Sequence, residues 1–157
     1  MTSATPPADN APPGRPTGAA RPQLRVIIVT GDRIVYDGPA DAVAAQGSRE
    51  VITVRLHHAP MLTMLELGEL VIHNAAQTAS YLISGGFMRV ADDSVTVLAE
   101  DAERPQDIDI AVAEADVRDA EALVKRYRSR PEVAALALRR AQVRLRAARK
   151  ARTVPGV

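Results

Sequence analysis

The sequence has 157 residues, of which 46% are hydrophobic and 25% are charged, and its formal net charge is +1. This composition is typical of a globular protein, and the near-neutral charge provides no overall attraction to nucleic acid or to an anionic membrane surface. The lack of cysteine excludes disulfides, thiolate catalysis and cysteine-based zinc sites.

Residues 1–22 form a proline-rich segment with almost no large apolar side chain. Prolines remove backbone donors and disfavour both helix and sheet, and a segment without apolar residues cannot offset the entropy lost on ordering. We therefore expect a disordered tail over residues 1–22. The segment lacks the apolar stretch of a signal peptide, and no later apolar run approaches the roughly 20 residues that span a bilayer.

Short runs rich in β-branched residues occupy the chain from Leu24 to residue 104. The runs read LRVIIV, DRIVYDG, ADAVAAQG, EVITVRL, ELVIHN, ASYLIS, FMRVA and SVTVLAE, and glycine, asparagine, aspartate or proline breaks the series. In EVITVRL, residues Ile52 and Val54 alternate with Val51 and Thr53, which predicts a half-buried strand. A succession of such short strands favours an antiparallel sandwich or barrel over βαβ units. We expect a β-sandwich domain over residues 23–104.

Two turn signals stand out within this domain. Gly85 and Gly86 separate two strand-like runs, where we expect the chain to bend or bulge between two runs of one sheet. ADDS, from Ala91 to Ser94, predicts a tight turn because aspartate tolerates the left-handed conformation.

The hydrophobic period changes from two to about 3.6 after Glu103. A first helix is predicted from a cap at Asp107 or Asp109 to about Arg128, and a second from a cap at Ser129 to about Arg152. Their apolar stripes are rich in alanine and comprise Ala113, Val117, Ala120, Val124 and Tyr127 in the first helix, and Ala134, Leu138, Ala141, Leu145 and Ala148 in the second. Small side chains allow close approach, which predicts an antiparallel helical hairpin over residues 105–152 and a flexible C-terminus over 153–157. The fold class is thus α+β, and the narrow helix seam makes the hairpin marginal and able to detach.

The second helix is strongly basic, with Glu132 as its only acidic residue. Its cations are Arg139, Arg140, Arg144, Arg146, Arg149, Lys150 and Arg152. Three interpretations remain open: a solvated helix face, an electrostatic surface for an acidic partner, and a nucleic-acid-binding helix. Against the last of these, the chain lacks interleaved aromatic residues and has a near-zero net charge.

The sequence contains no recognisable catalytic or metal-binding motif. GxxxxGK[ST], GxGxxG, HExxH and G-x-S-x-G are all missing. His57 and His58 are adjacent, so on a strand they would point to opposite faces, and His73 is remote in sequence; we therefore expect no metal site. We interpret the chain as a protein without an active site of its own.

Several segments together resemble the epsilon subunit of F-type ATP synthases. HHAPMLTML resembles the HAPLLT-type segment of that family, LELGEL its following strand entry, and LRVIIVTGDRIVYDG its opening strands. YLISGGFMRVADDSVTVLAEDAER is similar to its SGGF…VTVLAD…AER stretch, in which Gly85 and Gly86 match a double glycine. The resemblance covers about residues 24–150.

The resemblance implies a regulatory and coupling subunit of the central stalk, with no catalysis of its own. Its implied partners are the gamma subunit, the c-ring and the catalytic beta and alpha subunits, without nucleic acid or direct membrane insertion. Its implied location is peripheral, on the cytoplasmic face of the bacterial inner membrane. The residues implied at the gamma and c-ring interface are Thr30, Arg49, Glu50, His58, Thr63 and Ser84. Those implied in restraining ATP hydrolysis by contact with the catalytic subunits are Arg139, Arg140, Arg144, Arg146 and Arg149.

The sequence departs from the family pattern in two places. Thr53, Leu56 and His57 stand where the family usually has glycine, proline and glycine, at an edge that in the family faces the c-ring. Some bacterial members bind ATP through an [IL]DxxRA motif and two arginines of the second helix.

This chain matches that nucleotide-binding set at Ile108, Asp109, Arg140 and Arg144, but Val112 replaces the motif arginine. Loss of a phosphate-pairing arginine removes a strong contact. We therefore expect no cofactor, and little or no regulatory ATP binding.

Overall fold

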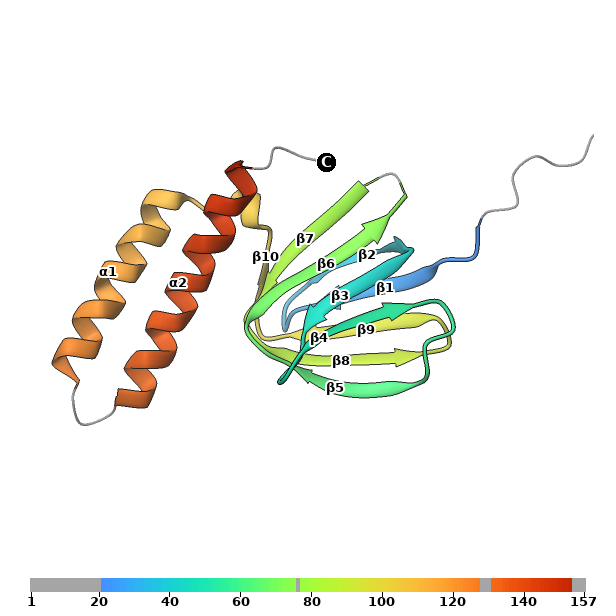
Figure 1. The fold of residues 1–157 in the computed structure, drawn as a ribbon, viewed down its shortest axis with the longest axis horizontal. Helices are drawn as coiled ribbons and strands as arrows, with labels where there is room; N and C mark the ends of the chain where they lie inside the picture. The colour runs from blue at the N-terminus through green and yellow to red at the C-terminus, as the bar shows by residue number, and fades with distance from the viewer. Residues whose placement is uncertain (1–20, 76, 128–130, 154–157) are drawn as a thin grey trace, which may run out of the picture.

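The computed structural model describes residues 21–75, 77–127 and 131–153. Most of the predicted tail at 1–22, the predicted cap Ser129 and residues 154–157 of the predicted C-terminus lie outside these ranges. Within them, ten strands precede one short 3-10 helix and two α-helices (Figure 1).

The strands form two five-stranded sheets packed face to face, which confirms the predicted β-sandwich. Sheet A has the order β2 (Ile34–Ala40), β1 (Leu24–Val29), β9 (Ser94–Ala99), β8 (Gly86–Ala91), β5 (Met61–Leu65). Sheet B has the order β10 (Ala102–Glu103), β7 (Gln77–Ile83), β6 (Gly68–Asn74), β3 (Ala42–Gln46), β4 (Val51–Arg55). Neighbouring strands are antiparallel except β1 and β9, which pair in parallel.

The core lies between the sheets and is built from the inward half of each alternating strand. Val54 is fully buried whereas Val51 is 59% exposed, as the alternation in EVITVRL predicts. Tyr81 is the largest fully buried side chain, and its ring meets that of Tyr36 edge to face at 5.9 Å. Few aromatic residues are needed because valine, isoleucine, leucine and methionine fill the remaining space.

The double glycine connects the two sheets, which corrects the prediction that it bends between two runs of one sheet. β7 belongs to sheet B and β8 to sheet A, so the chain crosses the sandwich at this point. Gly85 and Gly86 have φ values of 124° and 136°, which other residues rarely adopt. A Cβ on Gly86 would lie 2.1 Å from the Leu98 carbonyl oxygen, so the backbones here approach too closely for any side chain. The predicted turn at ADDS is confirmed, with Asp92 and Asp93 at φ 51° and 54°.

The helical hairpin follows the short helix η1 (Pro105–Asp107) and consists of α1 (Ile110–Arg126) and α2 (Pro131–Thr153). Asp109 caps α1, since its carboxylate accepts hydrogen bonds from the backbone N–H groups of Ala111 and Val112. Thr153, assigned from the sequence to the C-terminal segment, is the last residue of α2.

The predicted alanine stripes form much of the seam between the helices, and their buried members are Ala113, Ala120, Ala134, Ala141 and Ala148. Val124 and Tyr127 also belong to the predicted stripe but are 36% and 47% exposed. The facing Ala134 and Ala137 are too short to cover this end of the seam, where a hollow of about 260 Å³ remains.

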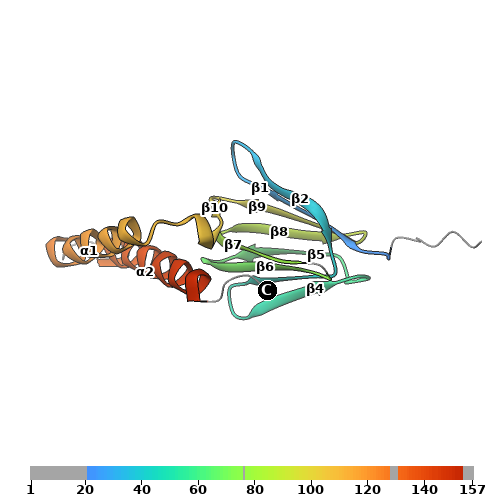
Figure 2. The same ribbon diagram turned by 90° about the horizontal axis from the view of Figure 1, so that it is seen from above.

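The hairpin lies against one end of the sandwich, with α2 nearer to it than α1 (Figures 1 and 2). The C-terminal half of α2 approaches β7 and η1, where Leu82 packs with Ile108, Ala147 and Ala148. The helices therefore add a small second cluster and do not extend the sandwich core.

Candidate interaction surfaces

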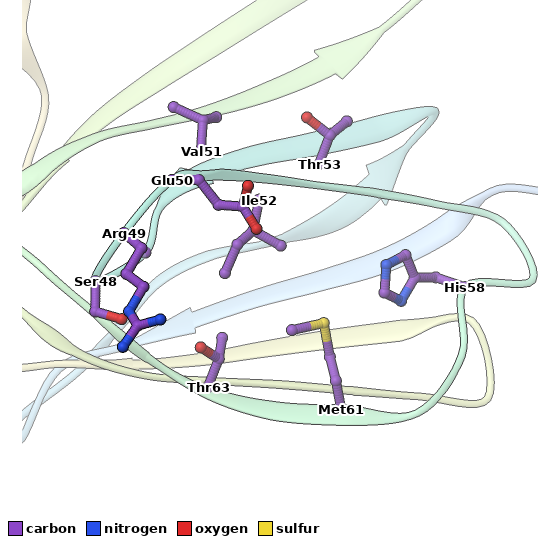
Figure 3. A pocket seen from close by; sticks show the side chains of 10 residues that line it. Ser48, Arg49, Glu50, Val51, Ile52, Thr53, His58, Met61 and Thr63 are labelled. Carbon is purple, nitrogen blue, oxygen red and sulfur yellow. The ribbon is translucent and has the colours of Figure 1, made fainter.

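A groove of about 530 Å³ lies between β4 and β5, the edge strands of the two sheets on the same side of the sandwich (Figure 3). It gathers four of the six residues assigned to the gamma and c-ring interface: Arg49, Glu50, His58 and Thr63. Figure 3 shows Thr63 and Met61 rising from β5 toward β4, with Arg49 near one end and His58 at the other. The sandwich thus brings together residues from two segments that the sequence alone separates.

Backbone contacts fix both ends of the groove. At one end, the N–H of Gly47 donates to the Glu50 carbonyl at 2.9 Å, and a β-bridge joins Gly47 to Leu65. At the other, the N–H of His58 donates to the Arg55 carbonyl at 3.2 Å. Because β4 and β5 are edge strands, the groove is open and suits contact with a protein surface more than enclosure of a small molecule.

Thr30 and Ser84 lie outside the groove. Thr30 is 7% exposed, and its hydroxyl donates to the Asp32 carboxylate at 2.8 Å, so it shapes the turn after β1. Ser84 lies between β7 and β8, where its N–H donates to the Asp101 carbonyl at 3.1 Å.

The outer face of sheet A carries an apolar row that sequence reasoning missed. The strand registers place Met64 beside Phe87, Phe87 beside Leu98, Leu98 beside Val29, and Val29 beside Ile34. Exposures are 62%, 49%, 54% and 63% for Met64, Phe87, Leu98 and Ile34. Each residue alone is an ordinary surface residue, and only the strand order unites the row across all five strands.

His57, which stands where the family usually has glycine, adopts φ 61°. This left-handed conformation explains why glycine suits the position. Here the His57 N–H donates to the carboxylate of Asp93, and the ring Nδ1 lies 3.3 Å from the same group. Thr53 is exposed on β4, and Leu56 packs against the edge of the core.

Four of the five arginines assigned to the catalytic-subunit contact already pair within the chain. Arg139 lies 3.6 Å from Glu66, and Arg140 lies 3.2 Å from Glu100. Arg144 pairs with Glu103 at 2.6 Å and with Asp116 at 2.8 Å. Arg149 pairs with Glu114 at 2.8 Å, whereas Arg146 makes no ion pair with any described residue.

The residues that match the nucleotide-binding pattern are packed, capping or ion-paired within the chain. Ile108 is 2% exposed within the small cluster at the base of the hairpin, and Asp109 caps α1. Val112 is 52% exposed and supplies no charge. The hydrogen bond from Arg144 to Glu103 raises the pKa of that guanidinium above its ordinary value, against the effect of partial burial.

Two further findings concern ligands and membranes. Across the described residues, no group of three histidine, aspartate or glutamate side chains is arranged to hold a metal ion. Neither of the described α-helices combines the length and apolar content that crossing a bilayer demands.

Comparisons with known proteins agree with the resemblance seen in the sequence. Residues 23–105 match the family described as "ATP synthase, Delta/Epsilon chain, beta-sandwich domain". The ATP synthase epsilon chain of Dehalococcoides mccartyi is 40% identical over 138 residues, which cover 86% of this chain and 99% of that protein. The chloroplastic epsilon chain of Atropa belladonna is 35% identical over 126 residues, covering 79% and 95% of the two chains.

The fold also occurs in a solved structure. A chain from the Euglena gracilis mitochondrial ATP synthase, in a structure of OSCP, F1 and the c-ring, aligns with a TM-score of 0.70 at 19% identity. The alignment covers 87% of this chain and 88% of that one. The match to the family model over residues 23–105 and the 40% identity over 99% of the Dehalococcoides protein show that the chain belongs to the ATP synthase epsilon chain family.

Proposed function

We propose that this chain is a non-catalytic coupling subunit of the ATP synthase central stalk and that it binds the gamma subunit through the outer face of sheet A. The observation that carries this proposal is the apolar row Met64, Phe87, Leu98, Val29 and Ile34. An apolar stripe across a whole sheet is costly to leave in water and fits a protein partner.

Co-purification with the gamma subunit from the source cell tests this assignment. Replacing Phe87→Glu and Leu98→Glu places carboxylates in the row without touching the core, since both side chains are about half exposed. We expect binding to fall by at least about 100-fold, because buried unpaired charges are strongly unfavourable in an interface. Thr78→Glu on sheet B is the matched control, and equal binding by all variants would contradict the assignment.

The open groove at β4 and β5 is proposed as the c-ring contact. Arg49 and Glu50 present opposite charges at its rim, and both are exposed. Rim charges chiefly set orientation and association rate. The variants Arg49→Glu and Glu50→Arg should therefore weaken assembly with the c-ring while leaving gamma binding intact. Assembled in this way, the chain is peripheral to the membrane, on the cytoplasmic face of the bacterial inner membrane.

The basic hairpin is proposed to restrain ATP hydrolysis by contacting acidic segments of the beta and alpha subunits. Deleting residues 105–157 should then raise hydrolysis by the assembled enzyme, and unchanged hydrolysis would argue against the restraint. In the folded state most of these arginines are occupied by glutamates or aspartate of the same chain. Contact with another subunit therefore requires them to exchange partners.

Regulatory ATP binding and nucleic-acid binding are less well supported. Asp109, Arg140 and Arg144 already have partners, and Val112 offers no phosphate ligand. Titration of the purified chain with ATP should show little or no saturable binding, and sub-millimolar affinity would contradict this expectation. The nucleic-acid alternative predicts salt-sensitive DNA retention by the full chain.

A further inference from the structure

A row of cations on α2 faces glutamates from four separate places on the sandwich. Arg139 and Arg140 approach Glu66 and Glu100 at 3.6 Å and 3.2 Å. One turn further along, Arg144 donates to both carboxylate oxygens of Glu103, at 2.6 Å and 3.2 Å. Near the end of the helix, the Lys150 Nζ lies 2.7 Å from Glu69.

These four glutamates come from the β5–β6 connection, β6, the β9–β10 connection and β10. The sandwich therefore presents one acidic edge to the helix.

The apolar part of the same interface is small. It consists of Leu82 of β7 against Ile108, Ala147 and Ala148, with Val143 and Leu145 partly buried beside them. Alanine removes little apolar surface from water, so this contact alone holds the hairpin weakly. The ion pairs therefore supply a substantial share of the attraction between the hairpin and the sandwich.

Two of the pairs are partly shielded from solvent, which reduces screening. The Arg144 and Glu103 side chains are 31% and 29% exposed, and the Glu69 side chain is 30% exposed. Burial acts to raise the pKa of Glu69. Hydrogen bonds from Lys150 and Ser80, with the charge of Lys150, more than reverse this effect and leave the pKa below its ordinary value. The docked helix thus stabilises the charged form of this glutamate.

We propose that the contacts of Arg139, Arg140, Arg144 and Lys150 with Glu66, Glu100, Glu103 and Glu69 form an electrostatic latch whose strength sets the fraction of hairpin docked on the sandwich. The latch uses internal carboxylates and needs no nucleotide. It opens when salt screens the pairs or when another acidic surface takes over the cations. The inference stands apart from the proposed function because it concerns the isolated chain.

The full-length chain allows a direct test, since it contains no cysteine and accepts labels at two introduced positions. Thr78→Cys on β7 and Glu132→Cys at the start of α2 lie outside the latch. The distance between the labels, measured by resonance energy transfer, reports docking. Raising NaCl from about 0.1 M to about 1 M shortens the Debye length from about 10 Å to about 3 Å and should lower the docked fraction.

Charge reversal distinguishes loss of these ion pairs from a nonspecific weakening of the contact between hairpin and sandwich. Each exposed or partly exposed pair contributes a factor of about 1.5 to 5, so losing all four pairs should lower the ratio of docked to undocked hairpin by at least about 5-fold. Reversing the four cations to glutamate should lower it further, because like charges then face each other. Reversing the four glutamates to lysine as well should restore docking, apart from the share that depends on the pair between Arg144 and Asp116 within the hairpin. Arg146→Glu, on the same helix and without a described ion pair, is the matched control and should leave docking unchanged.

Circular dichroism should show full helix content in every variant, so that a change in distance reports undocking and not melting. Docking that persists at about 1 M salt and in the fourfold variant would overturn the proposal. An effect of Arg146→Glu equal to that of Arg144→Glu would overturn it too, because it would show a response to net charge alone.

Discussion

The sandwich and the hairpin of this chain are stabilised by different means. Most of the sandwich core consists of large apolar side chains, including Tyr81, Leu24, Ile28, Leu70 and Ile72, each at most 1% exposed. The buried residues of α1 and α2 are all alanines. Between the hairpin and the sandwich the apolar contact is small, and four ion pairs supply much of the remaining attraction.

This difference shows how one small chain joins a rigid part to a movable one. Apolar burial in the sandwich is large and responds little to salt, so this part keeps its shape under changing conditions. Ion pairs at a partly exposed boundary are individually weak and exchange partners readily. The sandwich therefore suits a partner that recognises a fixed shape. The hairpin suits a contact that forms or breaks as its ion pairs change partners.

The largest effect should come from the point where the chain crosses between the sheets. Gly86→Ala forces a side chain into φ 136° and within 2.1 Å of the Leu98 carbonyl oxygen. We expect a loss of about 4 kcal/mol in the free energy of unfolding, or failure to fold. Urea denaturation of the purified variant measures it. Gly31→Ala, where nothing lies within 4 Å of the added Cβ, is the control.

A matched pair of truncations tests the contrast between the two parts directly. Ile72→Ala in the sandwich core should cost about 3 kcal/mol, because Ile72 is 1% exposed and leaves a cavity. Leu136→Ala in α2 should cost less than about 0.5 kcal/mol, because Leu136 is 49% exposed. Similar losses in thermal denaturation would show that the hairpin is packed as tightly as the sandwich.

The sequence predicted most of the elements, although not the strands β5 and β10, and it did not predict their long-range pairing. Alternation identified β4, and the cap Asp109 with Pro131 placed the two helices closely, because these signals are local. The parallel pairing of β1 with β9 and the crossing at Gly85 are global, and no local pattern encodes them.

The surfaces depend on this global arrangement as well. The groove needs β4 and β5 to be edge strands on the same side, and the apolar row needs the order of five strands. The ion pair of Lys150 with Glu69 joins residues 81 positions apart. The resemblance supplied Arg49, Glu50, His58 and Thr63 for the groove, whereas composition and periodicity alone would not have selected them.

The cap of α1 offers a smaller test, which also separates a structural role from a nucleotide-binding role. Asp109→Ala removes the acceptor for the N–H groups of Ala111 and Val112 and should cost about 1 kcal/mol. Asp109→Asn should retain most of the stability, since asparagine caps helices well. Helix melting followed by circular dichroism, without nucleotide, distinguishes the variants. If the Asp109→Ala variant is as stable as the parent chain, the capping role is contradicted.

The smallest effect is expected at His57, where three contributions nearly cancel. A left-handed conformation costs a non-glycine residue about 1–2 kcal/mol, which His57→Gly relieves. Two effects of the substitution lower the free energy of unfolding. Glycine gives the unfolded chain more entropy, which costs about 0.5–1 kcal/mol, and loss of the exposed contact with Asp93 costs about 0–1 kcal/mol. His57→Gly should therefore change the free energy of unfolding by less than about 0.5 kcal/mol.

His57→Ala keeps the strain and loses the ring, so it should be less stable than either glycine or histidine by about 0.5 kcal/mol or more. Urea midpoints of the three proteins give this order. If alanine equals histidine, Asp93 contributes nothing through the ring. If alanine also equals glycine, the left-handed backbone at this corner costs no more than the roughly 0.5–1 kcal/mol of chain entropy that glycine adds, and the usual glycine of the family would need another explanation.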